Sequence, residues 1–193
     1  MKTLISTAVA CAAALVLSSG ASAAITTYTA VLSGAAEFPP NASPGTGFAQ
    51  VDWDDVLNTM RVQASFQGLT GNTTACHIHA ATALPGVGTA GVATTTPTFA
   101  GFPLGVTAGV YDRTLDLTLS SSFNAAYVTA NGGTLTSAAT ALKAALDSGR
   151  AYFNVHSSTF GGGEIRGFLI AVPSPGAAGL CAMGGLVAMR RRR

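Results

Sequence analysis

The chain has 193 residues, of which 48% are hydrophobic and only 9% are charged. Its formal net charge of +2 depends on its ends, because Lys2 and the four arginines at 190–193 make up half of the ten basic residues. Between those ends, five basic residues stand against eight acidic ones, a net charge of −3, which leaves no basic patch for nucleic acid or an anionic membrane surface.

The N-terminal segment has the three parts of a secretory signal peptide. Lys2 provides the positive charge, residues 4–17 form the apolar stretch, and Ala21-Ser22-Ala23 has the small-x-small form of a signal-peptidase site. We therefore predict a signal peptide at residues 1–23 and a mature chain that begins at Ala24.

Cysteine usage indicates an exported domain without disulfides. Cys11 lies inside the predicted signal peptide, too early for a lipoprotein signal, and Cys181 lies near the C-terminus. Only Cys76 remains in the predicted domain, residues 24–172, so no disulfide can form within it and the domain must rely on its core. A domain of this length buries roughly two-thirds of the surface that its unfolded chain exposes.

Short runs rich in Thr, Val, Phe and Leu, separated by Gly and Pro, indicate β-strands along most of the domain. The clearest run is 59–66, where four apolar residues alternate with polar ones and should face the core. A strand at 47–53 is expected to pair with it as a hairpin across 54–58. A strand at 114–119 should likewise turn its three leucines inward. The remaining strands are predicted at 28–32, 75–80, 150–156 and 164–171.

Two short helices are predicted in the second half of the domain, after a long loop at 84–102. They lie at 123–130 and 137–148. Thr136 is expected to cap the second helix, and Gly149 suits the position just after its end.

These elements predict a mostly β fold, an antiparallel β-sandwich with one or two short helices inserted. Its core is expected to contain Met60, Val62, Phe66, Leu115, Leu117, Phe153, Val155 and Ile165.

The chain has three histidines, and all of them lie in the domain. His77 and His79 are two residues apart, so both side chains leave the same face of a strand. His156 ends another predicted strand, where it shares a face with Asn154. If the two strands are neighbours, the three imidazoles converge on one outer surface.

Two interpretations of this cluster are open. Three histidines on β-strands match a mononuclear Zn²⁺ or Cu²⁺ site, with His77, His79 and His156 as ligands. Alternatively, the imidazoles belong to a polar cluster and are hydrogen-bonded to Asn154, Glu164, Arg166 and backbone groups. The strand parity places Cys76 on the opposite, buried face, so it is not expected to be a ligand.

Four segments of the chain resemble the signature blocks of the CHRD domain, first named for its occurrence in chordin. They are residues 32–40, Cys76-His77-Ile78-His79, Tyr152-Phe153-Asn154-Val155-His156 and Gly163-Glu164-Ile165-Arg166-Gly167. The resemblance spans about residues 28–170. It implies an immunoglobulin-like sandwich of the kind found in extracellular proteins, with no well-established enzymatic activity.

The sequence gives little support for an enzyme. Paired histidines on a sandwich are similar to copper-zinc superoxide dismutase, but a dinuclear centre needs more than three histidines, and that family's disulfide cannot form here. No Gly-x-Ser-x-Gly motif is present for a hydrolase. Asp54 and Asp55 lie in a predicted turn and are interpreted as solvated.

The C-terminal segment, residues 173–193, resembles a PEP-CTERM sorting tail. A short proline motif precedes an apolar stretch at 176–189, and four arginines follow it, which should stay on the cytoplasmic side. The stretch has 14 residues, fewer than the ~17 that a bilayer span needs. An ordinary tail anchor is the alternative, since Ser174 stands where that family usually has Glu. The residues assigned to sorting are Pro173, Ser174, Pro175, Arg190, Arg191, Arg192 and Arg193.

We interpret the protein as an exported, non-catalytic module of the cell surface or extracellular matrix, associated with biofilm or exopolysaccharide. Its expected partners are an exosortase-type sorting enzyme and a matrix polysaccharide or surface protein. The chain would be anchored transiently in the inner membrane through its C-terminal helix and then displayed or released. The alternative is a mononuclear Zn or Cu protein with a redox role, using the three histidines.

The exported protein is predicted to begin at Ala24 and to lack the four terminal arginines. Intact-mass measurement of exported protein tests both ends at once. A species that retains the arginines would favour the simple tail anchor, and one that begins at a lipid-modified Cys11 would favour a lipoprotein.

Overall fold

The computed structural model describes residues 25–173. The predicted signal peptide and all of the predicted tail except Pro173 lie outside these residues, so the cleavage site, the apolar stretch and the arginines stay predictions. Within the described part of the chain, no helix is long and apolar enough to cross a membrane.

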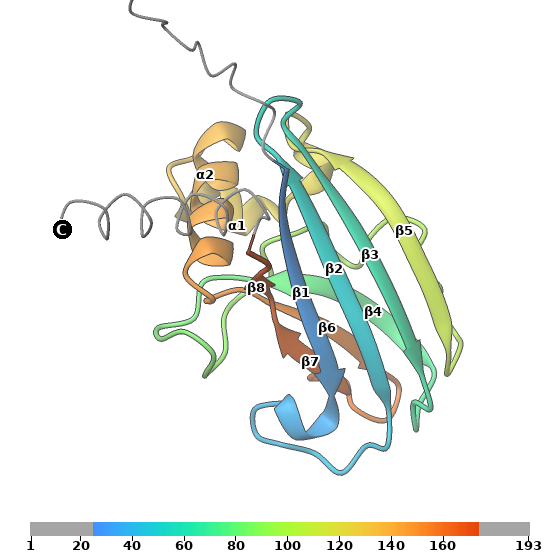
Figure 1. The fold of residues 1–193 in the computed structure, drawn as a ribbon. Helices are drawn as coiled ribbons and strands as arrows, with labels where there is room; N and C mark the ends of the chain where they lie inside the picture. The colour runs from blue at the N-terminus through green and yellow to red at the C-terminus, as the bar shows by residue number, and fades with distance from the viewer. Residues whose placement is uncertain (1–24, 174–193) are drawn as a thin grey trace, which may run out of the picture.

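Antiparallel strands form one sheet in the described chain. Its order is β4-β6-β7-β1-β2-β3-β5, and a short eighth strand also pairs with β1 (Figure 1). The bounds are β1 Ile25–Ser33, β2 Thr46–Asp54, β3 Thr59–Gln67, β4 Thr73–His79, β5 Gly109–Asp116, β6 Tyr152–Ser157, β7 Ile165–Phe168 and β8 Ile170–Ala171.

The hairpin of β2 and β3 follows from the alternation in the sequence. The two strands pair along their full length, from Thr46 opposite Gln67 to Asp54 opposite Thr59. The Asp54 carboxylate accepts two backbone N–H groups of the intervening turn, which closes it. The residues predicted to face inward are buried, namely Ala49, Val51 and Trp53 of β2 and Met60, Val62, Ala64 and Phe66 of β3. Phe48 of β2 lies on the other face and is 43% exposed.

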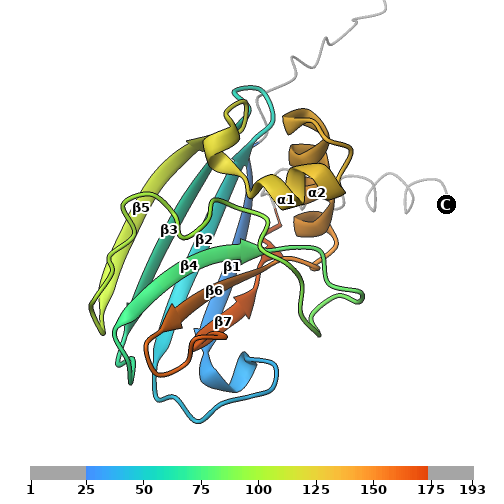
Figure 2. The same ribbon diagram turned by 180° about the vertical axis from the view of Figure 1, so that it is seen from behind.

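The sheet curls so that its two halves pack against each other. Figure 2 shows β4, β6 and β7 crossing in front of β1, β2 and β3. The register between the halves is limited to Ser33 of β1 opposite Arg166 of β7, so the sheet bends along this seam. A single hydrophobic core lies between the halves, and all eight residues predicted for it are buried there.

The structure therefore confirms a mostly β, antiparallel fold with two short helices. In the described residues every strand belongs to the same curled sheet, and the two-layered sandwich stays a prediction. The immunoglobulin-like arrangement stays a prediction.

The helices are α1, Ala125–Ala130, and α2, Leu135–Asp147. Thr134 caps α2, not Thr136, because the helix begins two residues before its predicted start. The Thr134 hydroxyl accepts the N–H of Ser137, whose side chain accepts the N–H of Thr134. Gly149 follows the end of α2 with φ +63°, as predicted.

Two predicted strands end differently. The strand predicted at 114–119 overlaps β5 only at 114–116, because β5 begins at Gly109 and ends at Asp116. The Asp116 carboxylate accepts the N–H and hydroxyl of Thr118 in the turn that follows. Leu119 is 52% exposed, so the prediction that it faces the core is wrong. The strand at 164–171 is divided into β7, which pairs with β6, and β8, which pairs with Tyr28 and Thr29 of β1.

Phe153 lies at the centre of the core, fully buried and stacked on Phe99. We expect Phe153→Ala to lower the free energy of unfolding by about 3–5 kcal/mol, because the cavity cannot fill without moving both halves of the sheet. Urea denaturation measures this, with the 77%-exposed Val110→Ala as the matched control. Equal midpoints for the two variants would contradict the placement of the core.

Candidate metal centre

The three histidines come together because β4 and β6 are neighbours. Their antiparallel register sets His77 opposite Asn154 and Ala75 opposite His156, which brings His156 to the side of the β4 histidines. One ring nitrogen from each histidine lies within 4.8 Å of the other two. The ring centroids are 5.2–5.8 Å apart. The predicted convergence is therefore present.

The cluster is covered, however, and does not lie on an outer surface. His77 is 6% and His79 is 8% exposed, and His156 is partly buried. The loop that follows β4 folds back over this face, where the carbonyls of Ala90 and Pro97 contact the rings. The position of this loop could not be predicted from the sequence, because its Gly and Thr residues show no regular pattern.

Each imidazole is held by one backbone carbonyl. His77 Nε2 lies 2.7 Å from Pro97 O, His79 Nδ1 lies 2.9 Å from Ala90 O, and His156 Nδ1 lies 3.0 Å from Gly161 O. A carbonyl can only accept, so the nitrogen beside it must carry the proton. In the neutral ring, the other nitrogen is then left with a free lone pair.

The other nitrogen of each ring is the one left free for a ligand. His77 Nδ1, His79 Nε2 and His156 Nε2 are buried and have no hydrogen-bond partner in the described structure. Three unpaired acceptors at one buried point are unfavourable unless a donor or a cation lies between them. The backbone contacts outside the triad fix the tautomers in the way that second-shell groups do at metal sites.

Electrostatics keep the rings neutral. Burial lowers the pKa of all three imidazoles, and for His79 it lowers the pKa to about 4. The other two histidines and Arg166 add smaller lowering effects at His79, while the bond to Ala90 opposes them. Neutral imidazole is the form that binds a metal.

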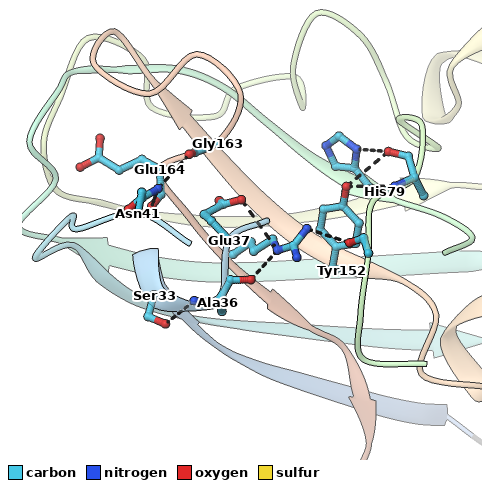
Figure 3. A network of polar contacts seen from close by, with 11 residues as sticks. Ser33, Ala36, Glu37, Asn41, His79, Tyr152, Gly163 and Glu164 are labelled. Atoms are coloured by element: carbon cyan, nitrogen blue, oxygen red, sulfur yellow. Dashed lines mark hydrogen bonds and ion pairs between the residues drawn. The ribbon is translucent and has the colours of Figure 1, made fainter. Parts of the chain in front are cut away.

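Tyr152 and Arg166 support His79 from behind. The Tyr152 ring stacks on His79, with centroids 4.8 Å apart and planes 6° from parallel, and the Arg166 guanidinium lies 4.7 Å from the centre of the tyrosine ring. His79 Nδ1 and the Tyr152 hydroxyl both bond to the carbonyl of Ala90, and Figure 3 shows the two side chains next to each other. The orientation of the His79 ring is therefore fixed from two directions.

Arg166 is anchored on its other side by Glu37 and backbone oxygens. It donates to the carbonyls of Ala36 and Gly88, and its Nε lies 3.7 Å from a Glu37 carboxylate oxygen. Burial raises the pKa of Glu37 to about 7, although the Arg166 charge opposes the shift. Both side chains are almost fully buried.

Glu164, placed by the sequence in the same polar cluster, lies elsewhere. Its carboxylate accepts the Ser43 hydroxyl and the N–H groups of Thr70 and Gly71, and Figure 3 shows it pointing away from Glu37 and Tyr152. Burial raises its pKa, but bonds from Ser157, Ser43 and these N–H groups outweigh burial and lower it. Glu164 thus joins the start of β7 to the turn before β4.

The alternative polar cluster is formed only in part. In the described residues, the imidazoles bond to backbone carbonyls, and no hydrogen bond joins them to Asn154, Glu164 or Arg166. Asn154 Oδ1 is itself buried and unpaired. It lies close to Gly163, where a Cβ would meet the Asn154 amide at 2.5 Å and Glu37 Oε1 at 2.7 Å, so only glycine fits at that position.

The sequence missed the groups that hold the ligands. The carbonyls of Ala90, Pro97 and Gly161 could not be predicted, because every residue has a backbone carbonyl and the residue type does not show which one contacts a histidine. Tyr152 could have been found, because it precedes Asn154 and His156 by even steps on the same strand and must share their face.

The fold and this cluster define a small antiparallel β domain with a candidate metal centre. The sequence model of the CHRD domain matches residues 28–169, a range that includes all three histidines and their supporting residues. The chain therefore belongs to the CHRD-domain family. Neither a comparison with curated proteins nor one with solved structures finds a match.

The depressed pKa of His79 predicts an acid-sensitive metal-free protein. The unfolded chain takes up a proton near the ordinary histidine value of about 6.5, whereas the folded chain does so only near pH 4, so the free energy of unfolding should fall as pH drops between these values. The loss attributable to His79 is on the order of 3 kcal/mol.

Urea unfolding at pH 7.5 and 4, with a chelator present, tests this in wild type and in His79→Gln. We expect the difference between the two pH values to be smaller in the variant. The raised pKa of Glu37 changes the free energy of unfolding with pH in the opposite direction. Because Glu37 is present in both proteins, its contribution cancels when the two are compared. Equal pH dependence would contradict a buried, neutral His79.

Proposed function

We propose that this CHRD-domain protein binds one transition-metal ion through His77, His79 and His156. The observation that carries the proposal is a set of three converging histidines, each with one ring nitrogen within 4.8 Å of the other two. In each ring one nitrogen is held by a carbonyl, and the other is buried and unpaired. An ion bound between the three histidines would give each unpaired nitrogen a partner.

The competing explanation, a hydrogen-bonded cluster without metal, accounts for only half of these contacts. It explains the three bonds to carbonyls. It leaves three buried acceptors without partners, each at a cost of roughly 1–3 kcal/mol. Since the three rings converge, a single ligand with positive charge is the simplest partner for these nitrogens.

The ligand set favours a borderline metal ion. Imidazole nitrogen suits zinc and copper, whereas Mg²⁺ and Ca²⁺ prefer oxygen ligands. Three histidines support a mononuclear site and are too few for a dinuclear copper-zinc centre.

The cellular role that we propose is an exported surface or matrix module, with the immunoglobulin-like sandwich of its family as its frame. Its support is the signal-peptide pattern at 1–23 and the tail at 173–193, which suggest an exosortase-type sorting enzyme and a matrix polysaccharide or surface protein as partners. The metal would then be held outside the cytoplasm, and this proposal is of a binding module, not an enzyme.

Calorimetric titration of the purified protein with Zn²⁺ and Cu²⁺ tests the site. We expect one ion per chain at pH 7.5, and binding lost in His79→Ala, because two imidazoles cannot enclose the ion. Burial lowers the pKa of all three imidazoles, so we expect affinity to fall at a pH below the ordinary histidine value of about 6.5.

The matched control is Cys76→Ala, which changes the opposite face of the strand that carries two of the ligands. It should keep full stoichiometry. Binding that survives His79→Ala, or weak binding of every metal at pH 7.5, would contradict the proposed site.

A further inference from the structure

We infer that the ion for which this site is built is monovalent copper, Cu⁺. This inference rests on the proposed function and concerns which metal the three histidines select. It follows from the number of ligands, their shielding and the charges around them.

The first argument is coordination number. In the described chain, no other His, Cys, Asp or Glu joins the group of three, and Cys76 is buried in the core on the opposite face of β4. Zn²⁺ takes four ligands in a tetrahedron, with water completing a site that has three protein ligands. Cu²⁺ prefers four or more in a tetragonal arrangement. Cu⁺ is d¹⁰ like Zn²⁺ but carries half the charge, and it is stable with three ligands.

The second argument is shielding. The three free nitrogens have almost no solvent-exposed surface, since the loop carrying Ala90 and Pro97 and the turn at Gly161 close over the rings. A water ligand for Zn²⁺ or Cu²⁺ needs an open position facing solvent. The closed arrangement suits an ion whose coordination is complete with the three imidazoles.

The third argument is charge. All three ligands are neutral, and the charged groups nearest to them are the Arg166 guanidinium, stacked behind Tyr152, and the Glu37 carboxylate paired with it. Among the described residues, Glu37 is paired with Arg166 and is not free to compensate an added cation. The cost of burying an ion rises with the square of its charge, so a dication costs about four times as much as a monocation.

The supporting contacts also limit rearrangement. Ala90 fixes both His79 and Tyr152, and the tyrosine ring lies flat against the imidazole. The rings cannot separate to admit a fourth or fifth ligand without breaking these contacts, which works against the tetragonal geometry of Cu²⁺.

The test is a pair of competition titrations on the purified full protein. Cu⁺ is supplied without oxygen as its bicinchoninate complex, and Zn²⁺ is supplied against a chromophoric chelator. We expect one Cu⁺ per chain, bound at least 100-fold more tightly than Zn²⁺. A variant with Cys11, Cys76 and Cys181 all changed to Ala should bind Cu⁺ equally well, which removes thiols as the source of affinity.

His79→Ala should abolish Cu⁺ binding, and His156→Gln, at the least buried position, provides a second variant that is more certain to fold. Circular dichroism verifies that each is folded. Cu⁺ binding that survives both substitutions would overturn the inference.

Glu37→Gln tests the charge argument separately. Loss of the carboxylate leaves the Arg166 charge uncompensated, and Coulomb energy is proportional to ion charge. The factor by which Glu37→Gln lowers the affinity for Zn²⁺ is therefore expected to be about the square of the factor for Cu⁺. Equal fold-losses would overturn the charge argument.

The outcomes separate this inference from the proposed function. Zn²⁺ or Cu²⁺ bound as tightly as Cu⁺, and lost in His79→Ala, would overturn the preference for Cu⁺ and leave the metal site standing. Failure of all three ions to bind would overturn both.

Discussion

The antiparallel pairing of β4 with β6 is the constraint on which the candidate site depends. It sets His77 opposite Asn154 and places His156 two pairs further along the ladder, opposite Ala75. A slip of one residue would turn the β6 side chains over and send His156 into the core. The register is held by the apolar residues on the other face, Cys76, Ile78, Phe153 and Val155, which are fully buried. Packing in the core thus determines where the ligands lie.

The candidate site also requires a segment that covers the polar face of β4 and β6, where the histidines lie. Imidazoles on an open sheet would bond to water, and their tautomers would not be fixed. Here Ala90, Pro97 and Gly161 each supply one carbonyl, and these bonds decide which nitrogen of each ring is free. Directional bonds from outside the triad therefore organise the lone pairs inside it.

Much of this arrangement follows from the sequence, and the part that does not has a physical reason. Alternation fixed which face of β3 is buried, and the spacing of His77 and His79 placed them on one side of a strand. The burial of these histidines did not follow, because it depends on a loop of 84–102 whose Gly and Thr residues have no periodicity. Glu164 was misplaced because parity describes a regular strand, whereas β7 begins only at Ile165 and Gly163 has φ +136°.

The loop that covers the site also protects an edge of the sheet. β4 is the outermost strand on its side, and its Cys76 and Ile78 carbonyls accept the N–H groups of Phe99 and Ala93 from that loop. Detachment of the loop would release the carbonyls that hold His77 and His79 and would expose an unpaired strand edge. Such edges template intermolecular pairing. Loss of the ligand geometry and a tendency to aggregate would therefore arise in the same opening event.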